Sequence, residues 1–254
     1  MGGLTVVREM IRQLPHESII YFGDTARVPY GPKSPDTVLR YSREITAYLK
    51  AEGVKALVIA CNTATAHALP ALRREYDMPI VGVIEPGARA AASATRTKRV
   101  GVIGTAGTIK SRAYEKEIIK LVPDAQVTAQ ACALFVPLVE EGWTDAEPTR
   151  AIARNYLAPM VSAEIDTLVL GCTHYPLMKT VIGNVVGRGV RLIDSAYETA
   201  RETAELLKSN GLENTSPNEA RYRFIASDAP DTFLALGERF LGSAIDRVET
   251  RTLG

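Results

Sequence analysis

Short apolar runs alternate with longer amphipathic segments along most of the chain. Seven such runs are predicted to be strands, and they span residues 18–22, 56–60, 80–84, 99–103, 167–170, 190–193 and 222–226. Several runs are apolar at every position rather than at every second one, which is typical of parallel strands covered on both faces. Strands that alternate with helices predict an α/β fold with open, mainly parallel sheets.

The segments between the runs carry helix signals. Ser34 is placed as an N-cap with Pro35 at the first helical position, and Gly53 is placed as the C-terminal cap. A second helix is expected over residues 195–209. A turn-like break at Glu85-Pro86-Gly87 and a second break before Ser195 predict a first domain of residues 1–84 and 195–254 and a second domain of residues 85–194.

Two cysteines stand in matching local settings. Cys61 and Cys172 each follow an apolar run and precede a segment expected to begin a helix. Ligands of open α/β sheets bind at the carboxyl ends of the strands, where both thiols would lie. The N–H groups and the dipole of a helix N-terminus favour a thiolate, so we expect the thiol pKa to fall below ~8.5. The same N–H groups can hold a substrate carboxylate.

Other interpretations of these residues remain open. A free cysteine is most often buried and inert, and Cys132, which lacks the strand-to-helix setting, is interpreted in that way. His67 is expected to be a packing or surface residue, and the spacing of the histidines and cysteines does not match a metal site. Cys172 with His174 could form an acyl-transfer nucleophile, which would leave Cys61 without a role.

Two polar turns add candidates of lower specificity. The turn at residues 23–31 contains Asp24 and Arg27, which form either part of a site or a surface ion pair. The turn at residues 104–108 is of the Gly/Thr type that can bind a phosphate or carboxylate, but it matches neither the P-loop nor the dinucleotide pattern.

Composition and charge narrow the class of protein to which the chain can belong. The chain has 254 residues, 46% apolar and 23% charged, with a net charge of +1, so no charge excess points to nucleic acid or to a membrane surface. No apolar run approaches the ~20 residues of a membrane span, and the N-terminus does not match a signal peptide. Three widely spaced cysteines do not form a disulfide pattern, so a cytoplasmic location is expected.

Four motifs occur in the order seen in a known enzyme family. They are Gly-Asp-Thr-Ala-Arg-Val-Pro-Tyr-Gly at 23–31, Ala-Cys-Asn-Thr-Ala at 60–64, Phe-Val-Pro-Leu-Val-Glu at 135–140 and Gly-Cys-Thr-His-Tyr-Pro at 171–176. Over nearly its whole length the chain resembles the glutamate racemases, which belong to the cofactor-independent two-cysteine aspartate/glutamate racemases. The resemblance implies two similar α/β domains facing each other across a cleft, and a homodimer. It also implies the interconversion of L- and D-glutamate for bacterial peptidoglycan, without pyridoxal phosphate or metal.

The resemblance also implies roles for individual residues. One cysteine would remove the α-proton as a thiolate while the other returns a proton to the opposite face. His174 would assist Cys172, and Glu140 would be a carboxylate near the site. The positions that match the family's substrate-binding residues are Tyr30, Gly31, Asn62, Thr63, Thr173 and His174.

The start of the chain departs from the family pattern. Family members open with a strand and an Asp-Ser pair before the Gly-Gly-Leu-Thr-Val segment, whereas this chain begins at Met1-Gly2-Gly3. We therefore expect a longer natural product or, failing that, a sheet short of one strand with reduced stability and weak racemisation. The competing hypotheses are a racemase of another amino acid such as aspartate, a thiol hydrolase using Cys172 and His174, and a binding protein without catalysis.

Overall fold

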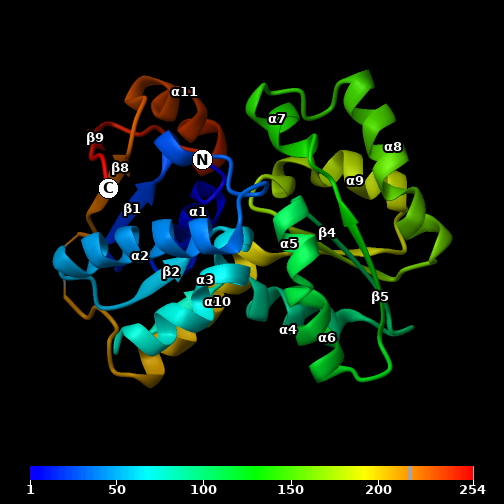
Figure 1. The fold of residues 1–254 in the computed structure, drawn as a ribbon, viewed down its shortest axis with the longest axis horizontal. Coiled ribbons are helices and arrows are strands. Elements are labelled where there is room, and N and C mark those ends of the chain that lie inside the picture. The colour runs from blue at the N-terminus through cyan, green and yellow to red at the C-terminus, as the bar shows by residue number, and fades with distance from the viewer. Residues whose placement is uncertain (217–218, 254) are drawn as a thin grey trace.

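The computed structural model describes residues 1–216 and 219–253, and its strands form two lobes (Figure 1). Every strand pair in the described residues is parallel. The predicted class, α/β with mainly parallel sheets, is confirmed. Within the described ranges no helix combines the length and the apolar character needed to cross a membrane.

The second lobe is built on one four-stranded sheet in the order β5-β4-β6-β7. Its central strands are continuous apolar runs, because helices cover both faces. The strands are β4 (Arg99–Gly104), β5 (Gln126–Ala131), β6 (Thr167–Gly171) and β7 (Arg191–Asp194). The helices are α4 (Ile84–Ala94), α5 (Ala106–Ser111), α6 (Ala113–Leu121), α7 (Phe135–Glu140), α8 (Glu147–Ser162) and α9 (Lys179–Val186), with the 3-10 turn η2 (Tyr175–Met178).

The first lobe draws its strands from both ends of the chain. They form two separate sheets, β1-β8-β9 and β2-β3, rather than a single one. The strands are β1 (Ile19–Gly23), β2 (Leu57–Ile59), β3 (Ile80–Gly82), β8 (Tyr222–Ala226) and β9 (Val248–Thr250). The helices are α1 (Leu4–Gln13), α2 (Pro35–Ala51), α3 (Asn62–Glu75), α10 (Ser195–Ser209) and α11 (Pro230–Leu241), with the 3-10 turn η1 (Thr25–Arg27).

All seven predicted strands are present, with ends shifted by at most two residues. The helix capped by Ser34 is α2, and the helix expected over 195–209 is α10. Among the described residues two strands were missed: β5 carries polar residues at a sheet edge, and β9 has only three residues. The predicted break at 85–87 is wrong, because these residues form the first turn of α4. Proline is tolerated there, since a backbone N–H in the first turn has no intrahelical partner.

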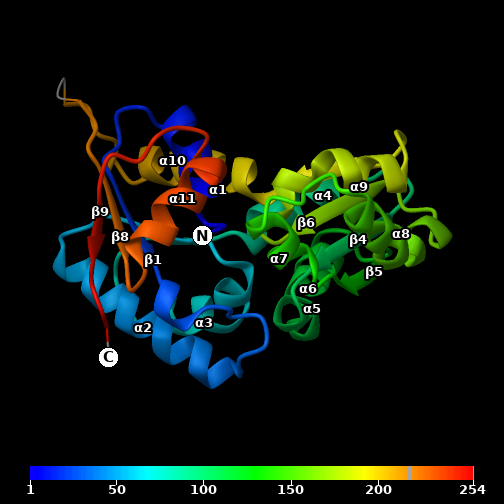
Figure 2. The same cartoon turned by 90° about the horizontal axis from the view of Figure 1, so that it is seen from above.

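The two lobes share their largest buried apolar cluster. Leu4 of α1 and Phe233 of α11 belong to the same cluster as Phe135 of α7 and Tyr175 of η2. The N-terminus lies in the first lobe, on the side toward the second lobe, in both views (Figure 2). The domain boundaries at 84/85 and 194/195 stay a prediction, and residues 217, 218 and 254 of the predicted first domain lie outside the described residues.

Candidate functional site

Cys172 lies in the second lobe, directly after the fully buried strand β6. The expected helix start is wrong here, because the chain makes a tight turn through Thr173 and His174 before η2. The amide of Tyr175 donates to the carbonyl of Cys172 at 3.1 Å, which is the three-residue spacing of a 3-10 turn. Cys172 therefore lacks the aligned dipole of an α-helix.

Cys61 lies in the first lobe and is the N-cap residue of α3. Its carbonyl accepts the first intrahelical hydrogen bond, from the amide of Thr65 at 2.8 Å. The predicted position of this thiol at a helix N-terminus is confirmed.

Burial dominates the acidity of both thiols. It raises the pKa of Cys61 despite hydrogen bonds from the amides of Ala64 and Thr63, and it raises the pKa of Cys172 to about 12. The expected fall in pKa is therefore wrong, because desolvation of the thiolate outweighs the local N–H groups. A charge on Cys61 raises the pKa of Cys172 further, so the two sulfurs share one electrostatic site and favour a single ionised thiol.

A relay of two side chains stands behind Cys172. The Sγ of Cys172 lies 3.7 Å from Nδ1 of His174, and Nε2 of His174 lies 3.0 Å from Oε1 of Glu140. Burial lowers the pKa of His174, and the hydrogen bond to His174 lowers the pKa of Glu140. A neutral imidazole that donates from Nε2 to the carboxylate leaves Nδ1 as an acceptor facing the thiol. The ring of Phe240 packs edge-on against His174 at 5.1 Å between centroids.

The first residues of the chain lie against this relay. A Cβ on Gly2 would come within 2.4 Å of Oγ1 of Thr173 and 2.5 Å of Nδ1 of His174, so only glycine fits at this position. The hydroxyl of Thr5 donates to the carbonyl of Thr173 at 3.0 Å. The lobes therefore meet at the turn that carries Cys172.

Three threonine hydroxyls join the lobes beside Cys61. Oγ1 of Thr63 lies 2.9 Å from Oγ1 of Thr105 and 3.2 Å from that of Thr108. Gly31 packs on the same residues, with its Cβ position 3.0 Å from Cβ of Thr105. The Gly/Thr turn at 104–108, a candidate of low specificity from the sequence, thus faces Thr63 and Gly31.

Asn62, the residue after Cys61, is buried, with 3% of its surface exposed. Its Oδ1 accepts a hydrogen bond from the hydroxyl of Tyr114, a residue of α6 in the other lobe, at 2.7 Å. Its Nδ2 has no hydrogen-bond partner among the described residues. An unpaired buried donor costs about 1–3 kcal/mol, so this amide is suited to an acceptor on a ligand.

Tyr30 is held by a buried charge network rather than by a surface pair. Asp24, 9% exposed, accepts hydrogen bonds from Nε of Arg27 at 2.9 Å and from the hydroxyls of Tyr30 and Ser227. Arg27 also pairs with Glu44. The surface ion pair considered from the sequence is wrong, because the turn folds inward: Asp24 is buried, and the side chain of Arg27 is only 15% exposed.

Two remaining candidates lie as expected, and two other residues of the site were missed by the sequence analysis. Cys132 is fully buried in the shared apolar cluster, and His67 is a half-buried residue of α3. Gly2 and Tyr114 were missed, since their contacts join segments far apart in the sequence. Across 1–216 and 219–253, no three His, Cys, Asp or Glu side chains gather in a group that could hold a metal ion.

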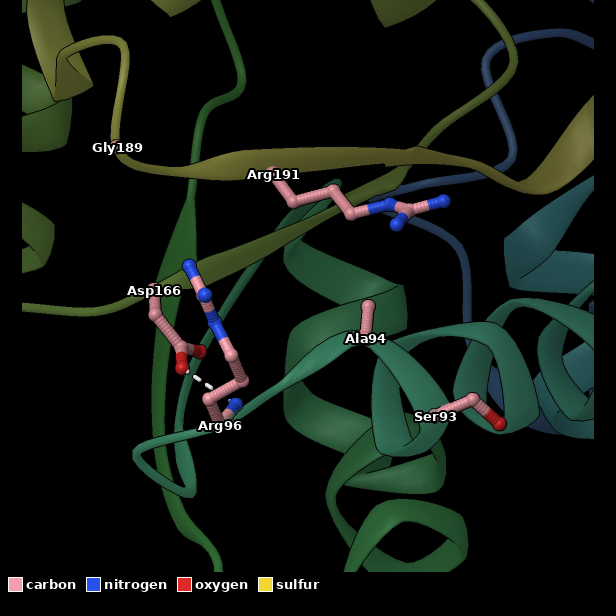
Figure 3. Close-up of a pocket in the computed structure, with 6 residues that line it drawn as sticks. All are labelled: Ser93, Ala94, Arg96, Asp166, Gly189 and Arg191. Atoms are coloured by element: carbon pink, nitrogen blue, oxygen red, sulfur yellow. Dashed lines mark hydrogen bonds between the residues drawn. The ribbon is translucent and has the colours of Figure 1, made fainter.

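A separate surface pocket of about 350 Å³ lies at the opposite ends of the strands of the second lobe. Asp166 directly precedes β6 and Arg191 opens β7, whereas Cys172 follows the far end of β6. The residues that line this surface pocket are Ser93, Ala94, Arg96, Asp166, Gly189 and Arg191 (Figure 3). The carboxylate of Asp166 is satisfied by the amides of Arg96 and Thr97 and the hydroxyl of Thr95. This pocket is distinct from the thiol site.

Comparison with known proteins agrees with this geometry. The family model described as Asp/Glu/Hydantoin racemase matches residues 2–203. The chain belongs to this family. It is 55% identical to a glutamate racemase of Geobacter metallireducens, with 98% of this chain and 92% of that protein covered. It is 49% identical to a glutamate racemase of Neisseria meningitidis, with 100% and 94% covered.

Solved structures of glutamate racemases resemble this racemase-family chain closely. An isoform from Bacillus anthracis superposes with a TM-score of 0.95 at 42% identity, covering 98% of this chain and 93% of that one. An enzyme from Francisella tularensis in complex with D-glutamate gives 0.93 at 37% identity, with 99% and 94% covered. The family resemblance drawn from the four motifs is confirmed.

Proposed function

We propose that this protein is a glutamate racemase that interconverts L- and D-glutamate by proton transfer at the α-carbon. The observation that carries the proposal is a pair of electrostatically coupled thiols, one in each lobe, with the Glu140–His174 relay behind one of them. Inversion of a stereocentre through a planar carbanion requires a base on one face and an acid on the other. Two thiols that favour a single ionised state match that requirement.

In the proposed cycle one thiolate removes the α-proton while the other thiol delivers its own proton to the opposite face. The second sulfur then holds the negative charge, and the cycle runs back when the thiols exchange roles. A positioned acid or base contributes about 10²–10⁴-fold to a rate. Burial makes the thiolate costly, and the ammonium group of an amino acid would favour it as an opposite charge.

The relay gives Cys172 a local proton acceptor. Glu140 fixes the Nε2–H tautomer of His174, so Nδ1 can take the thiol proton or hold it during turnover. Cys61 has no histidine beside it in the sequence, and its position at the N-terminus of α3 supplies N–H groups instead. The two thiols are thus activated by different means.

The substrate-binding part of the proposal rests on polar groups around the thiols. Asn62 offers an unpaired Nδ2 donor, and the hydroxyls of Thr63 and Thr173 lie on either side of the lobe interface. Tyr30 and Gly31 approach from the turn anchored by Asp24. We assign these residues to the carboxylates and ammonium group of glutamate.

The wider setting follows from the same proposal. The enzyme would work without a cofactor, as a cytoplasmic homodimer with a small-molecule substrate, and would supply D-glutamate for peptidoglycan.

The test is incubation with L-glutamate in D₂O, with the α-proton followed by NMR and the optical activity by circular dichroism. We expect deuterium at the α-carbon together with loss of optical activity, even if turnover is slow. Cys61→Ser should abolish racemisation. Cys132→Ser is the matched control, because this fully buried cysteine has no part in the proposed proton transfer, and it should retain activity.

Each alternative predicts a different result. A thiol hydrolase using Cys172 and His174 would not depend on Cys61. Faster turnover of aspartate than of glutamate would identify a racemase of the other substrate. Absence of both exchange and inversion with either amino acid would contradict the proposed function.

A further inference from the structure

Tyr114 contacts a residue beside each of the two thiols. It is 2% exposed, and it belongs to α6 of the second lobe. Its ring lies against Gly171, the residue before Cys172, where an added Cβ would meet Cε2 at 3.0 Å. Its hydroxyl reaches Asn62, the residue after Cys61, at 2.7 Å.

Glycines on two elements leave room for this ring. Besides Gly171, Gly87 of α4 faces it, and a Cβ there would lie 3.2 Å from both Cε1 and the hydroxyl oxygen. A larger residue at either glycine would push the ring away from Asn62. The packing therefore fixes the ring in one place between the lobes.

The hydrogen-bond geometry also fixes the orientation of the Asn62 amide. The hydroxyl of Tyr114 has one proton, and Oδ1 of Asn62 at 2.7 Å is a nearer acceptor than the carbonyl of Val83 at 3.4 Å. Burial raises the pKa of Tyr114, so the hydroxyl stays protonated at neutral pH. Once Oδ1 is occupied, Nδ2 is the half of the amide left for a ligand.

We propose that Tyr114 is a positioning residue that holds the Asn62 amide with Nδ2 directed to a substrate carboxylate oxygen. Tyr114 need not touch the substrate, because it acts through Asn62. Without the hydroxyl, the amide can rotate and present Oδ1, which would repel the same carboxylate. This inference rests on the proposed function for the identity of the substrate.

The test variant is Tyr114→Phe, which removes the hydroxyl and keeps the ring between the glycines. A buried neutral hydrogen bond is worth about 0.5–1.5 kcal/mol, which corresponds to roughly a 2–13-fold change. We expect KM for glutamate to rise by about that factor in both directions, with kcat changed less than about twofold. The matched control is Tyr156→Phe, because the Tyr156 hydroxyl accepts from the amide of Leu134 in the same lobe rather than donating to Asn62.

A double-mutant cycle separates positioning from general support of the fold. In an Asn62→Ala background, Tyr114→Phe should add no further loss of glutamate affinity, because the amide it orients is gone. Titration calorimetry with L-glutamate supplies this readout even if Asn62→Ala does not turn over. An equal loss in both backgrounds, or an unchanged KM in Tyr114→Phe, would overturn the proposal.

The two proposals fail in distinguishable ways. A wild-type chain that neither exchanges nor inverts glutamate contradicts the proposed function. A wild-type chain that racemises glutamate while Tyr114→Phe behaves like Tyr156→Phe contradicts only the positioning role of Tyr114.

Discussion

Replacement of Asp24 by alanine tests whether the turn at 23–31 is held by a buried charge network. Both oxygens of this carboxylate lie 2.9 Å from Nε of Arg27, and it also accepts from the hydroxyls of Ser227 and Tyr30. The side chain of Arg27 is only 15% exposed, and it keeps Glu44 as a partner when Asp24 is removed. The alanine variant thus leaves the guanidinium of Arg27 with one carboxylate partner, Glu44, instead of two.

The size of the effect follows from the burial. A surface ion pair contributes about 0–1 kcal/mol, whereas removal of one partner from a buried pair costs about 3–5 kcal/mol. Because Glu44 still faces Arg27, we expect the lower end, about 3 kcal/mol. For a chain of this size each kcal/mol moves Tm by about 2–4 °C, so Tm should fall by roughly 6–12 °C.

The assay is thermal unfolding followed by calorimetry, supported by urea titration. Glu75→Ala is the matched control, because Glu75 also binds an arginine, Arg43, through two oxygens but at an exposed position. We expect the control to lower Tm by at most about 4 °C. Equal losses of Tm in Asp24→Ala and Glu75→Ala would refute the reasoning from burial.

Two further predictions concern the relay and the thiols. Glu140→Gln should lower kcat about 10–100-fold with little change in KM, because the amide no longer fixes the His174 tautomer. Glu141→Gln, at the exposed neighbouring residue, is the control, and equal rates in the two variants would contradict the relay. Since burial raises the pKa of Cys172 to about 12, its thiolate fraction grows with pH, so kcat/KM for racemisation should rise from pH 6 to pH 8. A fall over that interval would show that thiol ionisation does not limit the rate.

Local patterns in the sequence determined much of the architecture. The predicted strands, the α2 helix capped by Ser34 and the place of Cys61 at the start of α3 agree with the structure. These features depend on side chains within one or two turns of each other, through burial period and capping. Edge strand β5 lacks that signal, because polar residues interrupt its sequence and none of its residues is fully buried.

Only the tertiary structure decided how the site is assembled. The contact of Glu140 with His174 and that of Tyr114 with Asn62 join residues 34 and 52 positions apart. The pKa of Cys172 is raised, although the sequence predicted a lowered one. Desolvation depends on every group packed around the sulfur, and the sequence displays only its neighbours in the chain. The sequence alone therefore determined which groups could carry the chemistry, and packing between the lobes decided their partners, their orientation and their charge.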